Sequence, residues 1–153
     1  MTRVLVDQIR SIKPVMVNLP KVIDVAVGVI CNADGNILLT QRPYHTTHAG
    51  YWEFPGGKLE SLESGESALY RELLEELGIT ISEPQFLFDI NHNYPDRTVQ
   101  LHVFLIKKYH GIPQCLEGQL AMRWVAIPDL PTLTFPEANQ PIQNYLIRNS
   151  KRL

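Results

Sequence analysis

Glutamate is concentrated between Gly57 and Ile79, and this acidic stretch constrains the chain more than any other feature of its sequence. Its second part, residues 66–77, has the apolar spacing that predicts an α-helix. At about 100° per residue on a helix, Glu72, Glu75 and Glu76 share an arc of roughly 100°. The sequence therefore predicts three carboxylates on one side of a single helix.

The apolar residues of the same helix fall on an adjacent arc, which we expect to face the protein interior. This inward set consists of Leu69, Tyr70, Leu73, Leu74 and Leu77. Ala68 falls among the carboxylates, where its small side chain leaves room for an ion. Ser64 is a suitable N-cap and Gly78 a suitable C-terminal stop, so the helix should begin and end beside them.

Carboxylates at these spacings repel one another by a few tenths of a kcal/mol per pair. A solvated acidic face would normally contain lysines, but Arg71 is the only cation in residues 66–77. A hard divalent cation would supply the missing positive charge, and an all-oxygen site suits Mg²⁺ or Mn²⁺. The alternative is an exposed acidic helix face that holds no metal.

The order of residues in the whole stretch favours the metal site. Gly57 is followed after five residues by Glu63 and, after seven more, by the run Arg-Glu-Leu-x-Glu-Glu-x-Gly-Ile at residues 71–79. This pattern resembles the Nudix box, the signature of hydrolases that cleave a nucleoside diphosphate linked to another group. Every specified position of the box is filled. Leu62 and Gly65 differ from common family choices, but only in the loop before the helix.

The resemblance extends from residue 22 to residue 146 and is greatest to MutT-type members, which remove oxidised guanine nucleotides from the precursor pool and so prevent mutations. It depends on short stretches in the matching order, at residues 53–58, 94–97, 117–119, 123–125 and 135–139. The resemblance implies an α/β/α sandwich, a nucleoside triphosphate such as 8-oxo-dGTP as substrate, and Mg²⁺ as cofactor with Mn²⁺ as a substitute. It also implies that the products are a nucleoside monophosphate and pyrophosphate.

The resemblance further implies which residues hold the metal and act in catalysis. The ligands would be one backbone carbonyl and four carboxylates, those of Gly56, Glu72, Glu75, Glu76 and Glu117. Glu72 would accept the proton of the attacking water, with Glu117 as the alternative base. Arg71 and Glu63 would pair and hold the helix against the preceding loop.

The substrate-binding residues implied by the resemblance are Arg42, Phe54, Arg97 and Asn139. Arg42 would contact a phosphate, while Phe54 and Arg97 would line the base pocket. Asn139 would read the base, because oxidation of guanine at C8 turns the acceptor N7 into a donor beside the acceptor O6. An asparagine amide offers one acceptor and one donor side by side. The alternatives are a surface charge for Arg42, a turn residue for Arg97 and a helix cap for Asn139.

Length, charge and cysteine content limit the domain organisation, the binding partners and the cellular compartment that we expect. The 153 residues suit one domain, with an extension at residues 1–20 before a Nudix domain at residues 21–153. A net charge of −2 and the lack of a basic stripe give no reason to expect a nucleic-acid polymer as partner. No apolar run is long enough to span a membrane, and no obligate protein partner is evident. Cys31 and Cys115 are far apart and suit the reducing cytoplasm, and we expect Cys31 in the core.

Apolar runs and turn signals predict the remaining elements. We expect strands at residues 22–30, 37–42, 51–54, 86–90, 99–107 and 121–127, with a hairpin turn at residues 32–36. A second helix is expected over residues 136–148, with Pro141 in its first turn. Strands from both halves of the chain and two helices predict an α+β fold, with a mixed sheet between the helices.

Two other functions stay open on the sequence. In the first, the same hydrolytic chemistry serves another nucleotide, such as a pyrimidine triphosphate or a nucleotide sugar. A non-catalytic, nucleotide-binding regulatory module is the other alternative. Such a module should have lost carboxylates of the box, and this chain has kept all of them.

Overall fold

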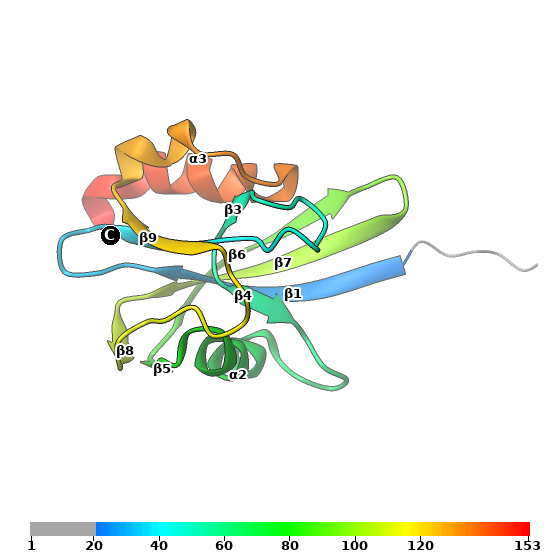
Figure 1. Ribbon diagram of the computed structural model, residues 1–153, viewed down its shortest axis with the longest axis horizontal. Coiled ribbons are helices and arrows are strands. Elements are labelled where there is room, and N and C mark those ends of the chain that lie inside the picture. Colours follow the sequence, from blue (N-terminus) through cyan, green and yellow to red (C-terminus); the bar gives the residue numbers. More distant parts are fainter. Residues whose placement is uncertain (1–20) are drawn as a thin grey trace, which may run out of the picture.

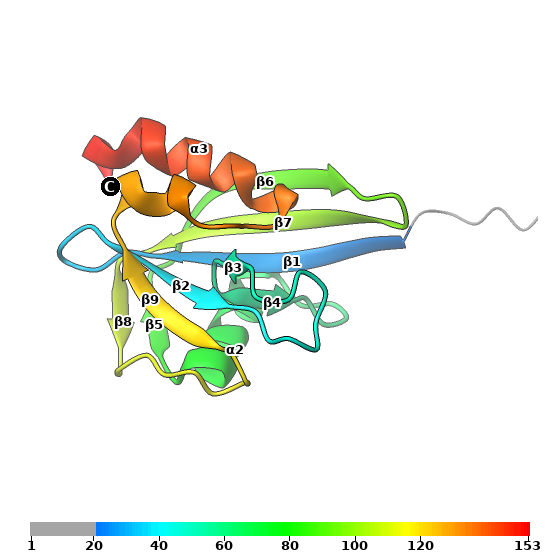
Figure 2. The ribbon, with the colours of Figure 1, turned by 45° about the horizontal axis from the view of Figure 1, so that its top comes forward.

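The computed structural model describes residues 21–153, so the expected extension at residues 1–20 lies outside the described part of the chain. The strands lie between two helices, α2 (Gly65–Leu77) and α3 (Gln140–Asn149). Figures 1 and 2 both place α3 on one side of the strands and α2 on the other. The expected α+β sandwich is confirmed.

The largest sheet has the strand order β4-β1-β7-β6. At its centre β1 (Lys21–Ile30) and β7 (Arg97–Ile106) run parallel and pair along their whole lengths. The outer strands β4 (Gly56–Lys58) and β6 (Gln85–Asn93) pair antiparallel with β1 and β7. The sheet is therefore mixed, as the sequence predicts.

Two smaller sheets and three 3₁₀ helices complete the fold. The order β3-β2-β9 joins β3 (Trp52–Glu53), β2 (Ile37–Gln41) and β9 (Ala121–Val125), all antiparallel. The second small sheet pairs β5 (Thr80–Ser82) with β8 (Lys108–His110). The 3₁₀ helices are η1 (Ile127–Thr132), η2 (Glu137–Asn139) and η3 (Ser150–Arg152).

Strand β1 contributes to two hydrophobic cores because successive side chains of a strand point to opposite faces. Val27 and Val29 lie in the same core as Ile142 and Leu146 of α3. On the other face, Ala26 and Ile30 share a core with three leucines of α2, which are Leu69, Leu73 and Leu77. Cys31 is buried in the first of these cores, as expected. Both helices are thus held to the strands by apolar packing.

Helix α2 begins and ends where the sequence predicts. Ser64 caps it by accepting a hydrogen bond from the Ser67 N–H at 3.1 Å, and Gly78 ends it in the left-handed conformation at φ +70°. The expected inward face is partly wrong, since Tyr70 is 37% and Leu74 54% exposed. Ala68, placed in the sequence analysis among the carboxylates, is fully buried.

The reason for this correction is the rotation of α2 about its axis. The helix turns the edge that contains Ala68, Glu72 and Glu76 towards the strands, so the far side of the apolar arc points to solvent. Contacts between α2 and both β1 and β4 are consistent with this orientation. An apolar stripe alone does not show which of its two borders is covered.

Several short elements were missed or misplaced in the expectations. Strands β4, β5 and β8 contain only three residues each, which is too short for an alternating pattern. The strand expected at residues 121–127 ends at Val125, and η1 follows. The second helix begins at Gln140, after η2, and Pro141 lies in its first turn as expected.

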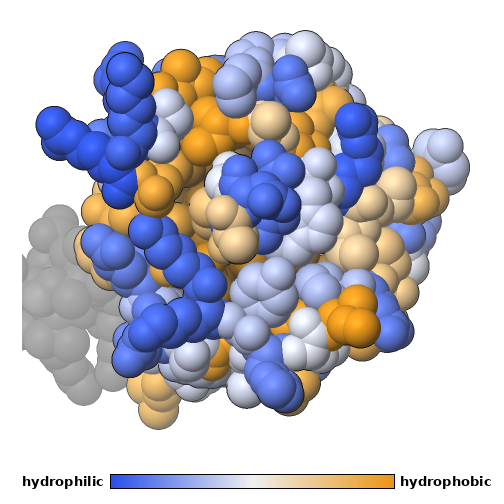
Figure 3. All heavy atoms as spheres, turned by 90° about the vertical axis from the view of Figure 1, so that its left-hand side faces the viewer, coloured by the Kyte–Doolittle hydropathy of each residue, from blue (hydrophilic) through white to orange (hydrophobic). Residues whose placement is uncertain are grey.

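The surface mixes polar and apolar side chains at the end of the molecule seen in Figure 3. Individual exposed apolar side chains include Leu62 at 105% and Ile112 at 81%. Among residues 21–153, no helix has the length and apolarity needed to cross a bilayer.

Candidate active site

Three of the expected metal ligands lie together. Glu72 and Glu76 project from successive turns of α2, and Glu117 comes from the loop between β8 and β9. One carboxylate oxygen from each residue lies within 4.8 Å of the other two. Three hard oxygen donors at this spacing fit a divalent cation such as Mg²⁺. Glu75 lies outside the cluster, and its Oε2 is 3.6 Å from Nη1 of Arg71.

Glu76 has the most strongly shifted pKa of these acids. Burial raises its pKa, the negative charges of Glu53, Glu72 and Glu117 add to the effect, and the pKa reaches about 9. The backbone N–H of Gly56 donates to Glu76 Oε2 at 3.3 Å and opposes the shift. A cation at this position would neutralise several carboxylates at once, which is the chemistry that the donor set favours.

Two adjacent glycines of β4 bring the sheet against the carboxylates of α2. A Cβ atom on Gly56 would lie 1.9 Å from the carbonyl oxygen of Ala26, and Gly56 has φ +154°. A Cβ atom on Gly57 would lie 2.2 Å from Cδ of Glu72. Gly56 is therefore required by its own backbone conformation and by the close Ala26 carbonyl, whereas Gly57 leaves space for the carboxylate of Glu72.

Arg71 connects the helix to the preceding loop, and its expected pairing with Glu63 is confirmed. Its Nε and Nη2 donate to the two oxygens of Glu63 at 2.9 and 2.8 Å, and Nη2 also donates to the Lys58 carbonyl at 3.1 Å. The hydrogen bond from Arg71 lowers the pKa of Glu63 to about 2. Nη1 donates to Oε1 of Glu72 at 2.8 Å, so the same guanidinium orients a carboxylate of the cluster.

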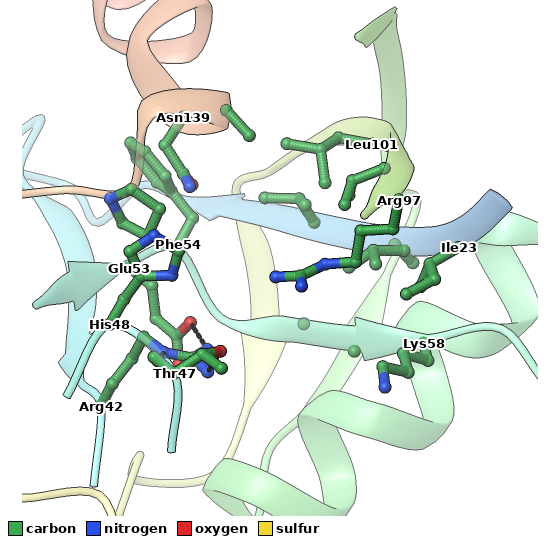
Figure 4. Close-up of a pocket in the computed structure, with 18 of the residues that line it drawn as sticks. Ile23, Arg42, Thr47, His48, Glu53, Phe54, Lys58, Arg97, Leu101 and Asn139 are labelled. Atoms are coloured by element: carbon green, nitrogen blue, oxygen red, sulfur yellow. Dashed lines mark hydrogen bonds and ion pairs between the residues drawn. The ribbon is translucent and has the colours of Figure 1, made fainter. Parts of the chain in front are cut away.

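A pocket of about 600 Å³ opens beside the cluster, with Glu76 and Gly56 in its wall. All four residues that the sequence analysis assigns to the substrate line this pocket: Arg42, Phe54, Arg97 and Asn139. Figure 4 shows Arg97 and Asn139 reaching towards the same space from β7 and η2. The volume is in the range of small-molecule sites, which is about 300–1,000 Å³.

Asn139 precedes α3, but its role as a side-chain cap is not supported. Within the described residues, its side chain makes no capping hydrogen bond. Phe54 is 4% exposed and stacks on Phe135, with the ring centroids 5.4 Å apart. The structure thus places an amide and a rigid aromatic ring in the wall of one pocket.

Arg97 takes part in a turn and also lines the pocket. Its backbone pairs with that of Tyr94, and its Nη1 lies 3.1 Å from Oδ2 of Asp96. Its guanidinium carbon lies 5.1 Å from the centroid of the Tyr94 ring, in a cation–π contact. The turn and the pocket are therefore compatible roles for this residue.

Arg42 is held in place at the opposite wall of the pocket. Its Nη1 donates to Glu53 Oε2 at 2.7 Å, and its Nε donates to the Thr47 carbonyl at 2.7 Å. Figure 4 shows these three residues together. Burial raises the pKa of Glu53 despite the neighbouring Arg42, and the Glu53 charge acts on Glu76. Glu53 thus pairs with the expected phosphate contact and also acts electrostatically on the carboxylate cluster.

A family model described as a NUDIX domain matches residues 26–145. The chain belongs to the Nudix family. An 8-oxo-dGTP diphosphatase of Escherichia coli is 37% identical over 122 residues, which cover 80% of this chain and 94% of that protein. A CTP pyrophosphohydrolase of the same organism is 41% identical over 104 residues, 68% of this chain and 76% of that protein.

A solved structure also resembles this Nudix protein closely. It comes from work on MutT of Aliivibrio salmonicida and Vibrio cholerae, with a TM-score of 0.73 and 40% identity. The match covers 84% of this chain and 99% of that one. Nudix hydrolase chemistry on a nucleotide is therefore the activity class of this protein.

Sequence reasoning missed two residues that line the pocket, Glu53 and His48. Glu53 was included only within the stretch at residues 53–58, and neither residue was assigned a role. Burial lowers the pKa of His48, and Arg42 and Arg97 add to the effect. The sequence did contain an indication for Glu53. It lies in a short strand directly before the buried Phe54, so its side chain points to the opposite face from that ring.

Proposed function

We propose that this Nudix protein hydrolyses 8-oxo-dGTP to the nucleoside monophosphate and pyrophosphate, with Mg²⁺ as cofactor and Mn²⁺ as a substitute. The observation that supports it most is the position of the carboxylate cluster beside a pocket whose wall contains Glu76, Asn139 and Phe54. This arrangement has space for a base at one end and for phosphates next to the acids. Removal of oxidised precursors would make the protein an antimutator.

The carboxylates of Glu72, Glu76 and Glu117 would hold the metal, with the backbone carbonyl of Gly56 next to them. Glu75 would join through a rotation of its half-exposed side chain. Bound Mg²⁺ supplies positive charge against phosphate oxygens and makes water more acidic. Phosphoryl transfer depends mainly on positioning and charge stabilisation, so no covalent protein intermediate is needed.

The protein side chains would act around the attack of water on the β-phosphorus. The new bond joins the water oxygen to phosphorus, and the bond between that phosphorus and the bridging oxygen on the α-phosphate side breaks. Glu72 accepts the proton of the water, and the Arg71 guanidinium at 2.8 Å keeps its carboxylate in one orientation. Arg42 contacts a phosphate, and Glu117 is the alternative base.

Recognition of the oxidised base would depend on Asn139. Its oxygen accepts from N7–H of 8-oxoguanine and its N–H donates to O6, whereas unmodified guanine presents two acceptors. Leaving one polar group unpaired costs about 1–3 kcal/mol, which corresponds to roughly a 5- to 150-fold preference. Phe54 and Arg97 would form the walls beside the base.

A pyrimidine triphosphate is the second candidate substrate, since a relative named CTP pyrophosphohydrolase is 41% identical. The test is a comparison of kcat/KM for 8-oxo-dGTP, dGTP and dCTP with Mg²⁺, together with identification of the products. The proposal requires preference for 8-oxo-dGTP, and replacement of Asn139 by Ala should reduce that preference. Equal turnover of dCTP and 8-oxo-dGTP would refute it. Loss of pyrophosphate release in a folded Glu76→Gln variant would distinguish an enzyme from a regulatory module.

A further inference from the structure

The loop at residues 111–120 brings Glu117 to the cluster although it contains no helix or strand. The loop is attached to the C-terminal end of α2 by backbone hydrogen bonds. The N–H of Gln114 donates to the Leu77 carbonyl and the N–H of Leu116 to the Glu76 carbonyl, both at 3.0 Å. These bonds satisfy carbonyls that have no partner within the helix. They fix the start of the loop but not the segment after Glu117.

Gln119 makes a further connection to α2 with its side chain, while the N–H of Leu120 attaches the end of the loop to β2 by donating to the Gln41 carbonyl at 3.0 Å. Its Nε2 donates to the backbone carbonyl of Glu76 at 3.0 Å, and its Oε1 accepts from the backbone N–H of Glu117 at 2.8 Å. One amide therefore bridges the backbones of two residues whose carboxylates lie within 4.8 Å of each other. Among residues 21–153, no other side chain of this loop is hydrogen-bonded to α2.

The backbone between the two loop residues is shaped for this bridge. Gly118 has φ +73°, a left-handed conformation that favours glycine, and a Cβ atom there would meet nothing within 4 Å. The turn at Gly118 lets the Gln119 side chain return to the N–H of Glu117, two residues earlier. Gln119 is also partly buried, whereas Glu117 and Gly118 are exposed. The order Glu-Gly-Gln thus has a structural reason.

We infer that Gln119 is a positioning residue that holds Glu117 in register with Glu76 and so completes the three-carboxylate site. This inference depends on the proposed metal site and adds the residue that assembles it. Partners that orient metal ligands typically change metal affinity by about 10- to 100-fold when they are removed. An amide whose two ends are both used cannot be replaced by an apolar side chain of similar length.

The test uses the variant Gln119→Met and, as a matched control, Gln114→Met on the same loop. Across the described residues, the Gln114 side chain forms no hydrogen bond, and its backbone bond to Leu77 survives the substitution. Mn²⁺ affinity measured by electron paramagnetic resonance should fall about tenfold in Gln119→Met and stay within about twofold in Gln114→Met. Amide hydrogen exchange at Glu117 should speed up only in the first variant.

A double mutant distinguishes an effect that acts through Glu117 from an independent disturbance of the structure. If Gln119 acts through Glu117, the variant with both Glu117→Gln and Gln119→Met should bind Mn²⁺ as weakly as Glu117→Gln alone. The inference would be overturned if the losses of Mn²⁺ affinity in the two single variants were fully additive, or if Gln119→Met bound Mn²⁺ with wild-type affinity. Neither result would contradict the proposed metal site itself. Absence of Mn²⁺ binding by the wild-type protein would overturn both the proposed function and this inference.

Discussion

Substitution of Gly57 by alanine tests whether the absence of a side chain at this position is needed to accommodate the carboxylate of Glu72. A Cβ atom at Gly57 would lie 2.2 Å from Cδ of Glu72 and 2.4 and 2.6 Å from its two oxygens. Since carbon atoms in contact are about 3.5 Å apart, the carboxyl group must retreat by about 1.3 Å. Gly57 has no left-handed backbone, unlike Gly56, so the effect of the substitution is confined to this contact.

The expected magnitudes follow from what the carboxylate loses. Its hydrogen bond from Arg71, at 2.8 Å, would lengthen or break. A hydrogen bond to a charged group contributes about 1.5–3 kcal/mol, so we expect the free energy of unfolding to fall by about 2 kcal/mol. A catalytic group displaced by about 1 Å costs on the order of 100-fold in rate, so kcat should fall by about that factor.

The assay is pyrophosphate release from 8-oxo-dGTP with Mg²⁺, combined with urea unfolding. Gly65→Ala is the control, because a Cβ atom there meets side-chain carbon atoms of His102 and Phe104 at 3.3 and 3.4 Å, away from the carboxylates. The control should keep kcat within about threefold of wild type. A folded Gly57→Ala variant with wild-type kcat would refute the view that Gly57 exists to accommodate Glu72.

Three further predictions concern stability. Burial alone would lower the pKa of His102, but Asp24 and Asp89, at 3.0 and 2.6 Å, outweigh it and raise the pKa above 6.5. His102→Gln should therefore be less stable than wild type below about pH 6.5, and the difference should shrink as the pH rises through the raised pKa; equal differences at about pH 5.5 and about pH 9 would contradict this. Leu62→Gly should raise the free energy of unfolding, measured in urea, by about 0.5 kcal/mol. The exposed Leu62 has φ +63°, which costs about 1–2 kcal/mol for a residue with a Cβ atom, whereas glycine loses about 0.5–1 kcal/mol in conformational entropy. A lower free energy of unfolding would show that the left-handed conformation is not strained. Ser64→Ala should remove the N-cap of α2 and lower the free energy of unfolding by about 1 kcal/mol, which would lower the melting temperature. An unchanged melting temperature would argue that the cap does not stabilise the helix.

The sequence was most informative where the determinants are local. The ends of α2 were predictable because Ser64 and Gly78 act within one turn of the helix that they terminate. The orientation of α2 was not predictable, because it depends on the close approach of β4, a strand of three residues without a period of its own. Tyr70 and Leu74 are exposed for that reason.

In the candidate site, too, local features could be predicted from the sequence and contacts between distant segments could not. The spacing of Glu72 and Glu76 on one helix was visible in the sequence, and so was the pairing of Arg71 with Glu63 within the box. The position of Glu53 beside Arg42 was not, because two strands of different lengths must pair before these side chains meet. Long-range pairing of this kind leaves no local pattern.

The most direct test of the central claim is a crystal of this protein soaked in Mn²⁺, followed by an anomalous difference map. We predict a peak bonded to carboxylate oxygens of Glu72, Glu76 and Glu117, and its loss in Glu76→Gln. A well-ordered crystal with no peak at these three residues, or with a peak unaffected by Glu76→Gln, would contradict the account.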